Sequence, residues 1–388
     1  MLKKECTIVF DADPFCFGPI STTLHIVEQL KCRNNLPDNC KIILLGTLTT
    51  CQLAEKSGLF DAIYECNTTS MHDLKKYKKL ITDADLYISN TNLSSIEFAV
   101  ETGTPVIYVD TLFWMWNTLP TDLNIADKVF IQDFHGVEEN ISRLSDIVGN
   151  YQIVSPLIPA VQHDDRDNTG GILISLGGID TVYATTTDFW FHFLRDLLAL
   201  PALQKKEITI AGGGYSINRL ADIFAQSHPH VTIGCFSKSD FMKHLGRASK
   251  VLATPGLTTF YECQGLKKDV FFLPPQNYSQ QLQLKTYLEH YPSSVKGFLW
   301  ESGYGYPDIK RHLPEKEGIA LVQKCINHYL QSPREVQRAM ALIDDFLKRE
   351  RTTIEVCSKY KLTTPDTTIS RYIEDKLSHD NELTADCN

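Results

Sequence analysis

Short apolar runs alternate along the chain with segments whose apolar residues recur at helical spacing. The first run, Thr7 to Phe10, leads into a segment with apolar residues at Ile20, Leu24 and Val27. Such runs predict buried strands, and the helical period predicts helices between them. Further strands are expected at residues 41–45, 62–64, 86–89, 105–109, 128–131 and 152–154. This alternation predicts a parallel sheet with helices on both faces.

A polar, proline-containing stretch at residues 155–170 interrupts the alternation and predicts an interdomain linker. A second alternating series follows, with strands expected at residues 171–176, 207–211, 231–234, 250–253 and 269–273. We therefore expect two tandem Rossmann-like, doubly wound α/β domains, residues 1–160 and 170–350, facing a central cleft. The polar tail, residues 351–388, is expected to hold one short helix, from Ile369 to Leu377, and a disordered end.

The composition is that of a globular protein. Its 388 residues suffice for two domains, and 43% hydrophobic and 22% charged residues are ordinary values. The net charge of −9 argues against binding to nucleic acid or to an anionic membrane. No apolar run reaches the roughly 18 residues of a membrane span, and the chain starts without a signal peptide's apolar region. The 11 cysteines, an odd number without a C-x-x-C pair, fit reduced thiols in a cytoplasmic protein.

One stretch of the second series combines several features of a ligand site. Its fourth strand ends at Pro255-Gly256, and the next helix carries Glu262. A glycine lets a ligand approach the backbone, and the free N–H groups of a helix start suit a phosphate. We expect Thr258 or Thr259 to cap this helix and Glu262 to accept hydrogen bonds from a ribose diol. Alternatively, the glycine only ends the strand and Glu262 is a solvated acid.

Further loops end strands on the same side of this predicted sheet. Paired glycines permit close backbone approach, and amide side chains offer donors and acceptors to sugar hydroxyls. Taken singly, each loop is equally an ordinary turn. The candidates are Gly177, Gly178, Gly213, Phe236, Gln276, Asn277, Gln280 and Gln281.

The sequence Gly-Leu-Thr-Thr-Phe-Tyr-Glu, an apolar strand, and then Pro-Pro-Gln-Asn-x-x-Gln-Gln resemble the donor half of GT-B glycosyltransferases. The resemblance is closest to the peptidoglycan N-acetylglucosaminyltransferases that make lipid II, and it covers roughly residues 170–345. It implies a UDP-sugar as co-substrate, with no other cofactor. The diphosphate would lie near Gly177 and Gly178, beside Gly256, Leu257, Thr258 and Thr259. The ribose would meet Glu262, the sugar Gln280 and Gln281, and the base Phe236.

The N-terminal half resembles the acceptor half of these enzymes more loosely. Many members carry a glycine followed by a histidine that acts as general base, whereas this chain has Gly18-Pro19. We expect Asp13, and Asp11 as second choice, to replace that base, although two acids near a proline also suit a turn. Polar groups and aromatic rings after other strands are candidates for the acceptor site. These are Phe15, Gly18, Asn90, Asn92, Asp110, Trp114 and Trp116.

A combination of four motifs is also similar to that of cytosylglucuronic acid synthases, which join the sugar of UDP-glucuronic acid to cytosine. The motifs are Asp-x-Asp-Pro-Phe-x-Phe-Gly-Pro, Ser-Asn-Thr-Asn, Val-Asp-Thr-Leu-Phe-Trp-Met-Trp and Pro-Pro-Gln-Asn-Tyr-Ser-Gln. The function expected is an inverting transferase that acts on small molecules. It is expected to need no metal, because no cluster of His, Cys and carboxylate residues has metal-ligand spacing. The alternatives are a nucleotide-sugar hydrolase or epimerase, or a non-catalytic two-lobed binding protein. A dehydrogenase is disfavoured because neither half carries G-x-G-x-x-G.

Overall fold

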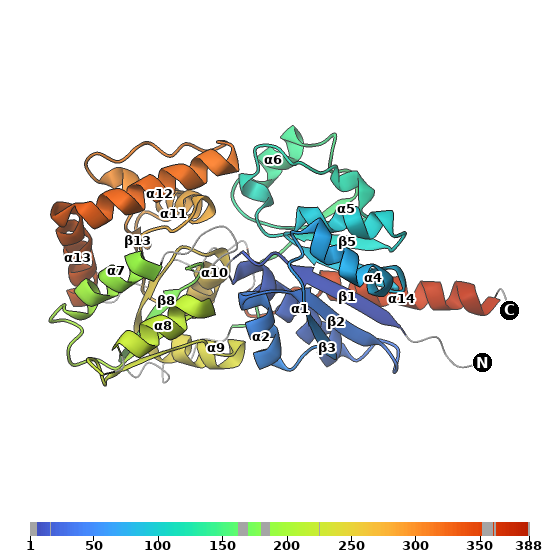
Figure 1. Ribbon diagram of the computed structural model, residues 1–388, viewed down its shortest axis with the longest axis horizontal. Coiled ribbons are helices and arrows are strands. Elements are labelled where there is room, and N and C mark those ends of the chain that lie inside the picture. Colours follow the sequence, from blue (N-terminus) through green and yellow to red (C-terminus); the bar gives the residue numbers. More distant parts are fainter. Residues whose placement is uncertain are drawn as a thin grey trace. The chain divides into compact units, whose positions relative to one another are not determined.

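The computed structural model describes residues 6–15, 17–161, 170–179, 187–224, 226–350, 360 and 362–386 (Figure 1). The chain forms two compact units. Unit 1 comprises Met1–Pro14, Gly18–Pro159 and Thr364–Asn388, and unit 2 comprises Phe15–Phe17 and Ala160–Thr363. Parts of the predicted linker and tail, residues 162–169 and 351–359, lie outside the described residues.

Unit 1 is built on a seven-stranded sheet in the order β3-β2-β1-β4-β5-β6-β7, and every neighbouring pair is parallel. The strands are β1 (Thr7–Ala12), β2 (Lys41–Gly46), β3 (Ala62–Glu65), β4 (Leu86–Asn90), β5 (Val106–Asp110), β6 (Lys128–Gln132) and β7 (Tyr151–Val154). The helices are α1 (Gly18–Arg33), α2 (Thr49–Ser57), α3 (Met71–Leu74), α4 (Lys78–Thr82), α5 (Leu93–Glu101), α6 (Val137–Arg143) and α14 (Thr368–Asp386).

Aspartates fix the register of unit 1 at the amino ends of its strands. Asp61, Asp85 and Asp127 each precede a strand and accept a hydrogen bond from the backbone of a neighbouring strand, at 2.7, 2.8 and 2.8 Å. The middle positions of the strands between these ends are mostly apolar and buried. The amino ends therefore carry structural contacts, whereas ligands of doubly wound sheets bind at the opposite, carboxyl ends.

The C-terminal tail differs from the prediction. The helix expected from Ile369 to Leu377 extends from Thr368 to Asp386 as α14, so the expected disordered end is helical up to that residue. Ile369, Ile373 and Leu377 repeat every four residues and join the hydrophobic core that also contains residues of α1. Arg33 of α1 forms a bidentate ion pair with Glu374 of α14. The last helix of the chain, α14, thus packs against the first, α1, and both belong to unit 1 (Figure 1).

Unit 2 repeats the architecture with a six-stranded parallel sheet in the order β10-β9-β8-β11-β12-β13. Its strands are β8 (Gly171–Leu176), β9 (Ile208–Gly212), β10 (Val231–Gly234), β11 (Ala248–Ala253), β12 (Val270–Phe272) and β13 (Lys296–Gly297). Its helices are α7 (Thr187–Leu198), α8 (Gly214–Phe224), α9 (Lys238–Arg247), α10 (Leu257–Gly265), α11 (Tyr278–His290), α12 (Glu315–Gln331) and α13 (Pro333–Lys348). The predicted pair of Rossmann-like, doubly wound α/β folds is confirmed.

A buried charge cluster lies at the amino ends of the unit 2 strands. Asp269, just before β12, has no exposed surface and accepts hydrogen bonds from Lys250 at 3.0 Å and from Arg349 at 2.8 Å. The Lys250 ammonium also donates to the carbonyl of Phe346 at 2.8 Å, and it lies 4.6 Å from the centre of that ring. These contacts fix the end of α13 against the sheet.

Candidate functional site

The predicted donor residues gather at one edge of the unit 2 sheet. All its strands are parallel, so the loops after β8, β9, β10, β11 and β12 emerge at the same, carboxyl edge. The strand order changes direction between β8 and β11, because β9 and β10 lie on one side of β8 while β11 and β12 lie on the other. Ligands of doubly wound sheets bind at such a switch point.

The glycine turn after β8 is tied to two other loops at this edge. The carbonyl oxygen of Gly177 accepts a hydrogen bond from the Thr254 hydroxyl at 2.8 Å and one from the Gln280 side-chain amide at 3.0 Å. Gly178 has φ +81°, a left-handed conformation that only glycine adopts cheaply. The turn therefore combines a conformation specific to glycine with a fixed carbonyl.

Helix α10 begins earlier than the sequence predicted. Neither Thr258 nor Thr259 is the cap, because the helix starts at Leu257 with Gly256 at its N-cap, and no side chain of the described residues caps it. Phe260 donates the first helical hydrogen bond, to the carbonyl of Gly256 at 2.9 Å. The N–H groups of the three residues before it have no acceptor within the helix. Within the described part of the chain, the positive end of α10 thus has no side-chain cap, as an anion site requires.

Glu262, predicted to meet a ribose, lies one turn into α10 with no exposed surface. One carboxylate oxygen pairs with the ammonium group of Lys238, and the other, Oε2, has no hydrogen-bond partner among the described residues. Burial raises the pKa of Glu262, and Lys238 opposes that shift. Sequence reasoning missed Lys238, although it follows the predicted Phe236 by two positions and starts α9.

The loops after β9 and β10 complete this edge. Gly213 is buried between β9 and α8, where Gly214 adopts φ +76° and allows the strand to turn into the helix. Phe236 is half-buried, and its ring centre lies 4.8 Å from that of His244. A half-buried ring leaves part of its surface for stacking, the interaction that a nucleobase uses.

The amide side chains that follow β12 differ in their hydrogen bonds. Asn277 caps α11 through its side chain, which accepts the backbone N–H of Gln280 at 2.9 Å. The Gln276 side chain donates to the carbonyl of Pro274 at 2.8 Å. Gln281 is fully buried, and neither its amide oxygen nor its nitrogen has a hydrogen-bond partner in the described part of the chain. A buried amide without partners is a rare arrangement that a polar ligand or water relieves.

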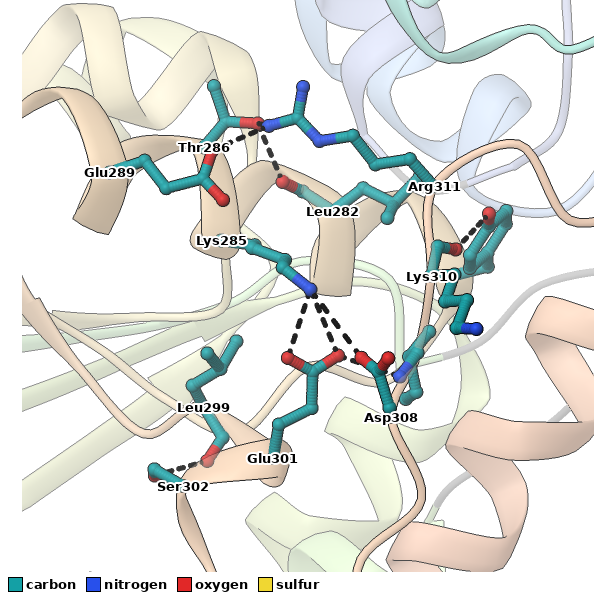
Figure 2. A network of polar contacts seen from close by, with 12 residues as sticks. Leu282, Lys285, Thr286, Glu289, Leu299, Glu301, Ser302, Asp308, Lys310 and Arg311 are labelled. Carbon is teal, nitrogen blue, oxygen red and sulfur yellow. Dashed lines mark hydrogen bonds and ion pairs between the residues drawn. The ribbon is translucent and has the colours of Figure 1, made fainter.

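A second polar network holds α11 itself in place, as Figure 2 shows. Lys285 lies 3.2 Å from Glu301 and 3.8 Å from Asp308, and Arg311 donates to Glu289 at 2.9 Å. These pairs join α11 to Glu301, which follows β13, and to the irregular segment 303–314. The first turn of α11, which carries the amide cluster, is therefore supported from further along the same helix.

In unit 1, Asp11 lies at the end of β1 and has no exposed surface. Its Oδ2 accepts a hydrogen bond from Asn92 at 2.7 Å, and Asn92 also donates to the Thr68 hydroxyl at 2.9 Å. Burial raises the pKa of Asp11 to about 6, and neighbouring hydrogen bonds lower it by less. The structure thus brings together Asp11 and Asn92, both predicted site residues, but their contact is buried inside unit 1.

Asp13 lies beyond the end of β1 and is half-buried. Its backbone N–H donates to the carbonyl of Asn90 at 3.0 Å, which links the two predicted residues through the main chain. The Asn90 side chain donates to the carbonyl of Pro19 at 3.0 Å. Gly18 begins α1, and a Cβ added there would meet no atom within 4 Å. Phe15 belongs to the segment grouped with unit 2.

The third predicted acceptor group follows β5. Asp110 is fully buried and accepts hydrogen bonds from the Trp116 indole N–H at 3.0 Å and from the backbone of Leu112 at 2.7 Å. Burial raises the pKa of Asp110 to about 6. Trp114 is only 4% exposed and packs edge-on against Phe134. Asp110 therefore organises this loop, and of the two tryptophans only Trp116 keeps a half-buried ring.

The described residues hold no group of three or more His, Cys, Asp or Glu side chains arranged to bind a metal ion. None of the helices in the same part of the chain combines the length and apolar character that crossing a membrane requires.

Comparison with solved structures shows the same fold. A structure of TcCGT1 in complex with UDP aligns with TM-score 0.52 and 12% identity, covering 96% of this chain and 100% of that one. A putative UDP-N-acetylglucosamine 2-epimerase from Listeria monocytogenes aligns with TM-score 0.51 and 13% identity, covering 92% and 100%. No protein-family model and no curated protein matches the chain. The two sheets are those of a GT-B fold, as the sequence predicted.

Proposed function

We propose that the protein is an inverting, metal-independent glycosyltransferase that moves a sugar from a UDP-sugar to a small acceptor. The observation that carries the proposal is the carboxyl edge of the unit 2 sheet. There the uncapped start of α10, the Gly177-Gly178 turn and the buried carboxylate of Glu262 follow neighbouring strands. Backbone N–H groups and a carboxylate are the partners that a nucleoside diphosphate requires.

Each part of the donor has a matching group on unit 2. The N–H groups of Leu257, Thr258 and Thr259, at the positive end of α10, stabilise the negative charge that develops on the departing diphosphate. The free oxygen of Glu262 accepts a hydrogen bond from the ribose diol. The unpartnered amide of Gln281 binds a hydroxyl group of the sugar, and the Phe236 ring contacts the base.

On unit 1, Asp13 is the general base of the proposed reaction. It is half-buried just beyond the end of β1, whereas Asp11 has no exposed surface. The acceptor gives its proton to Asp13 as its nucleophilic atom bonds to the anomeric carbon. The bond from that carbon to the diphosphate breaks on the opposite face, and UDP leaves with the bonding electron pair.

The sequence motifs of both halves support a narrower assignment. Their similarity to cytosylglucuronic acid synthases favours UDP-glucuronic acid as donor and a nucleobase such as cytosine as acceptor. A planar base suits a loop that carries aromatic rings, and the partly exposed ring of Trp116 is the available stacking surface there.

The first test is a thermal-shift panel with UDP, UDP-sugars, ADP and NAD. A ligand at 100 times its dissociation constant adds about 2.7 kcal/mol of stability, which raises Tm by a few degrees. We expect a response to UDP and to UDP-glucuronic acid. A rise with NAD alone, or no response to any uridine nucleotide, would overturn the proposal.

The second test follows UDP-glucuronic acid and cytosine by chromatography, which separates epimers of equal mass, coupled to mass spectrometry. Transfer yields UDP and glycosylated cytosine in equal amounts. UDP release that needs no acceptor would identify a hydrolase, and conversion of the sugar without UDP release would identify an epimerase. Binding without any turnover would identify a non-catalytic binding protein. Each of these three outcomes would replace the proposed transferase.

A further inference from the structure

The carbonyl oxygen of Gly177 is the meeting point of three loops in unit 2. Thr254, directly after β11, donates its hydroxyl to this oxygen at 2.8 Å, and Gln280, in the first turn of α11, donates its amide at 3.0 Å. Thr254 and Gln280 are both 4% exposed. A carbonyl oxygen has two lone pairs, so the two donors fill its capacity.

The Gln280 side chain is fully engaged within the protein. Its Oε1 accepts the backbone N–H of Gln276 at 2.8 Å, while its Nε2 donates to Gly177. Only this orientation of the amide satisfies both partners, because a backbone N–H must donate and a carbonyl must accept. Gln280 therefore differs from its neighbour Gln281, whose amide has no hydrogen-bond partner among the described residues.

The fixed carbonyl determines where the adjoining N–H group points. The carbonyl of Gly177 and the N–H of Gly178 belong to one planar peptide group, and none of the described peptide bonds is cis. In a trans peptide these two groups point in opposite directions. Donors that hold the carbonyl toward β11 and α11 consequently turn the Gly178 N–H away from both elements.

The turn has little room to adopt another orientation. A Cβ at Gly177 would lie 3.4 Å from the Phe17 ring and 3.4 Å from the Thr254 hydroxyl. Gly178, at φ +81°, lies in the left-handed region and sets the direction of the next peptide. The Gly177-Gly178 peptide is thus held by packing as well as by two hydrogen bonds.

We propose that Thr254 and Gln280 are positioning residues that aim the N–H of Gly178 at the diphosphate of the donor nucleotide. The inference rests on the proposed function, and it assigns Gln280 a different role from the sugar contact that the sequence predicted. An oriented backbone N–H is an efficient partner for a phosphate oxygen because it needs no reorganisation when the ligand binds.

Isothermal titration of the full chain with UDP and with uridine, which lacks phosphate, tests this role. Thr254→Val keeps the side-chain shape and removes the donor, whereas Thr254→Ser keeps the hydroxyl and serves as the matched control. Gln280→Glu keeps the acceptor for Gln276 and places an oxygen against the Gly177 carbonyl. We expect Thr254→Val and Gln280→Glu to weaken UDP binding about fivefold or more, the effect of one lost hydrogen bond, and to leave uridine binding unchanged. Thr254→Ser should bind UDP like the wild type.

The outcomes separate this inference from the proposed function. Wild-type protein that binds no UDP overturns both. Wild-type protein that binds UDP, with Thr254→Val binding it equally well, overturns only the positioning role. Equal losses for UDP and uridine also overturn it, because they indicate general damage to the site. If Gln280→Glu fails to fold, judged by its melting curve, the comparison of Thr254→Val with Thr254→Ser still decides the question.

Discussion

The Lys238 ammonium forms an ion pair with Glu262, a carboxylate that has no exposed surface. Burial favours the neutral acid and raises the pKa of Glu262, while Lys238 favours the charged form. The lysine is itself partly exposed, with 24% of its side chain accessible. Lys238 therefore helps to set the protonation state of Glu262, the residue proposed to bind the ribose.

Replacing Lys238 should make nucleotide binding depend on pH. In Lys238→Met the opposing charge is lost, so the pKa of Glu262 rises further and the protonated acid persists to higher pH. A carboxylate accepts hydrogen bonds at both oxygens, whereas the protonated acid does so less well. We expect UDP affinity to be lower than in the wild type and to improve as pH rises, measured by titration at several pH values. Lys238→Arg, which keeps the cation, should retain the wild-type profile, and a flat profile in Lys238→Met would contradict this role.

Asp13→Asn should abolish transfer while leaving donor binding intact. The amide cannot take the acceptor's proton, and a positioned base contributes roughly 10² to 10⁴ in rate. We expect turnover with UDP-glucuronic acid and cytosine to fall by about that factor. The UDP dissociation constant should stay within about twofold of the wild type, because the donor groups belong to unit 2. Undiminished turnover in this variant would remove Asp13 from the mechanism.

The repeating apolar runs were enough to predict both sheets, because parallel strands buried on two faces leave a continuous hydrophobic signal. Strand β13 escaped prediction since Lys296–Gly297 is two residues long and not apolar. The start of α10 was misplaced by two to three residues. Threonine can cap a helix through its hydroxyl group, whereas the chain uses Gly256, which has no side chain to cap with.

The sequence alone could not predict which side chains of the site contact each other. Lys238 and Glu262 are 24 positions apart and belong to different helices, so their spacing carries no periodic signal. Asp110 and Trp116 were each predicted to bind an acceptor, whereas the structure joins them by a hydrogen bond of 3.0 Å. Gln280 and Gln281 are adjacent and chemically identical in sequence, and only their contacts distinguish them.

Asp269→Asn should destabilise unit 2 without affecting the nucleotide site. The carboxylate is buried and pairs with Lys250 and Arg349, and its loss leaves the mostly buried Lys250 ammonium and the partly exposed Arg349 guanidinium without their shared counter-charge. Removing one partner of a buried charge network costs about 3 kcal/mol or more. We expect the urea midpoint to fall accordingly and UDP affinity to stay unchanged, because Asp269 lies before β12, at the amino edge of the sheet. A matching loss of UDP affinity in folded protein would contradict this separation.

Two buried aspartates should make the protein less stable as pH rises through the acidic range. Burial raises the pKa of Asp11 and of Asp110 from 3.8 to about 6, so between these values the folded chain binds more protons than the unfolded chain. Their favourable contribution is complete below the unfolded pKa and is lost as pH rises through about 6. For each aspartate, the stability lost as pH rises amounts to about 3 kcal/mol.

Asp11→Asn isolates one of these contributions. The variant keeps an oxygen that can accept the hydrogen bond from Asn92, but it has no proton to lose. We expect the free energy of unfolding of Asp11→Asn, relative to the wild type, to improve steadily from pH 4 to pH 7 and then to level off. Urea titrations at matched pH values measure this difference. A constant difference across the range would show that the buried carboxyl group of Asp11 does not titrate there.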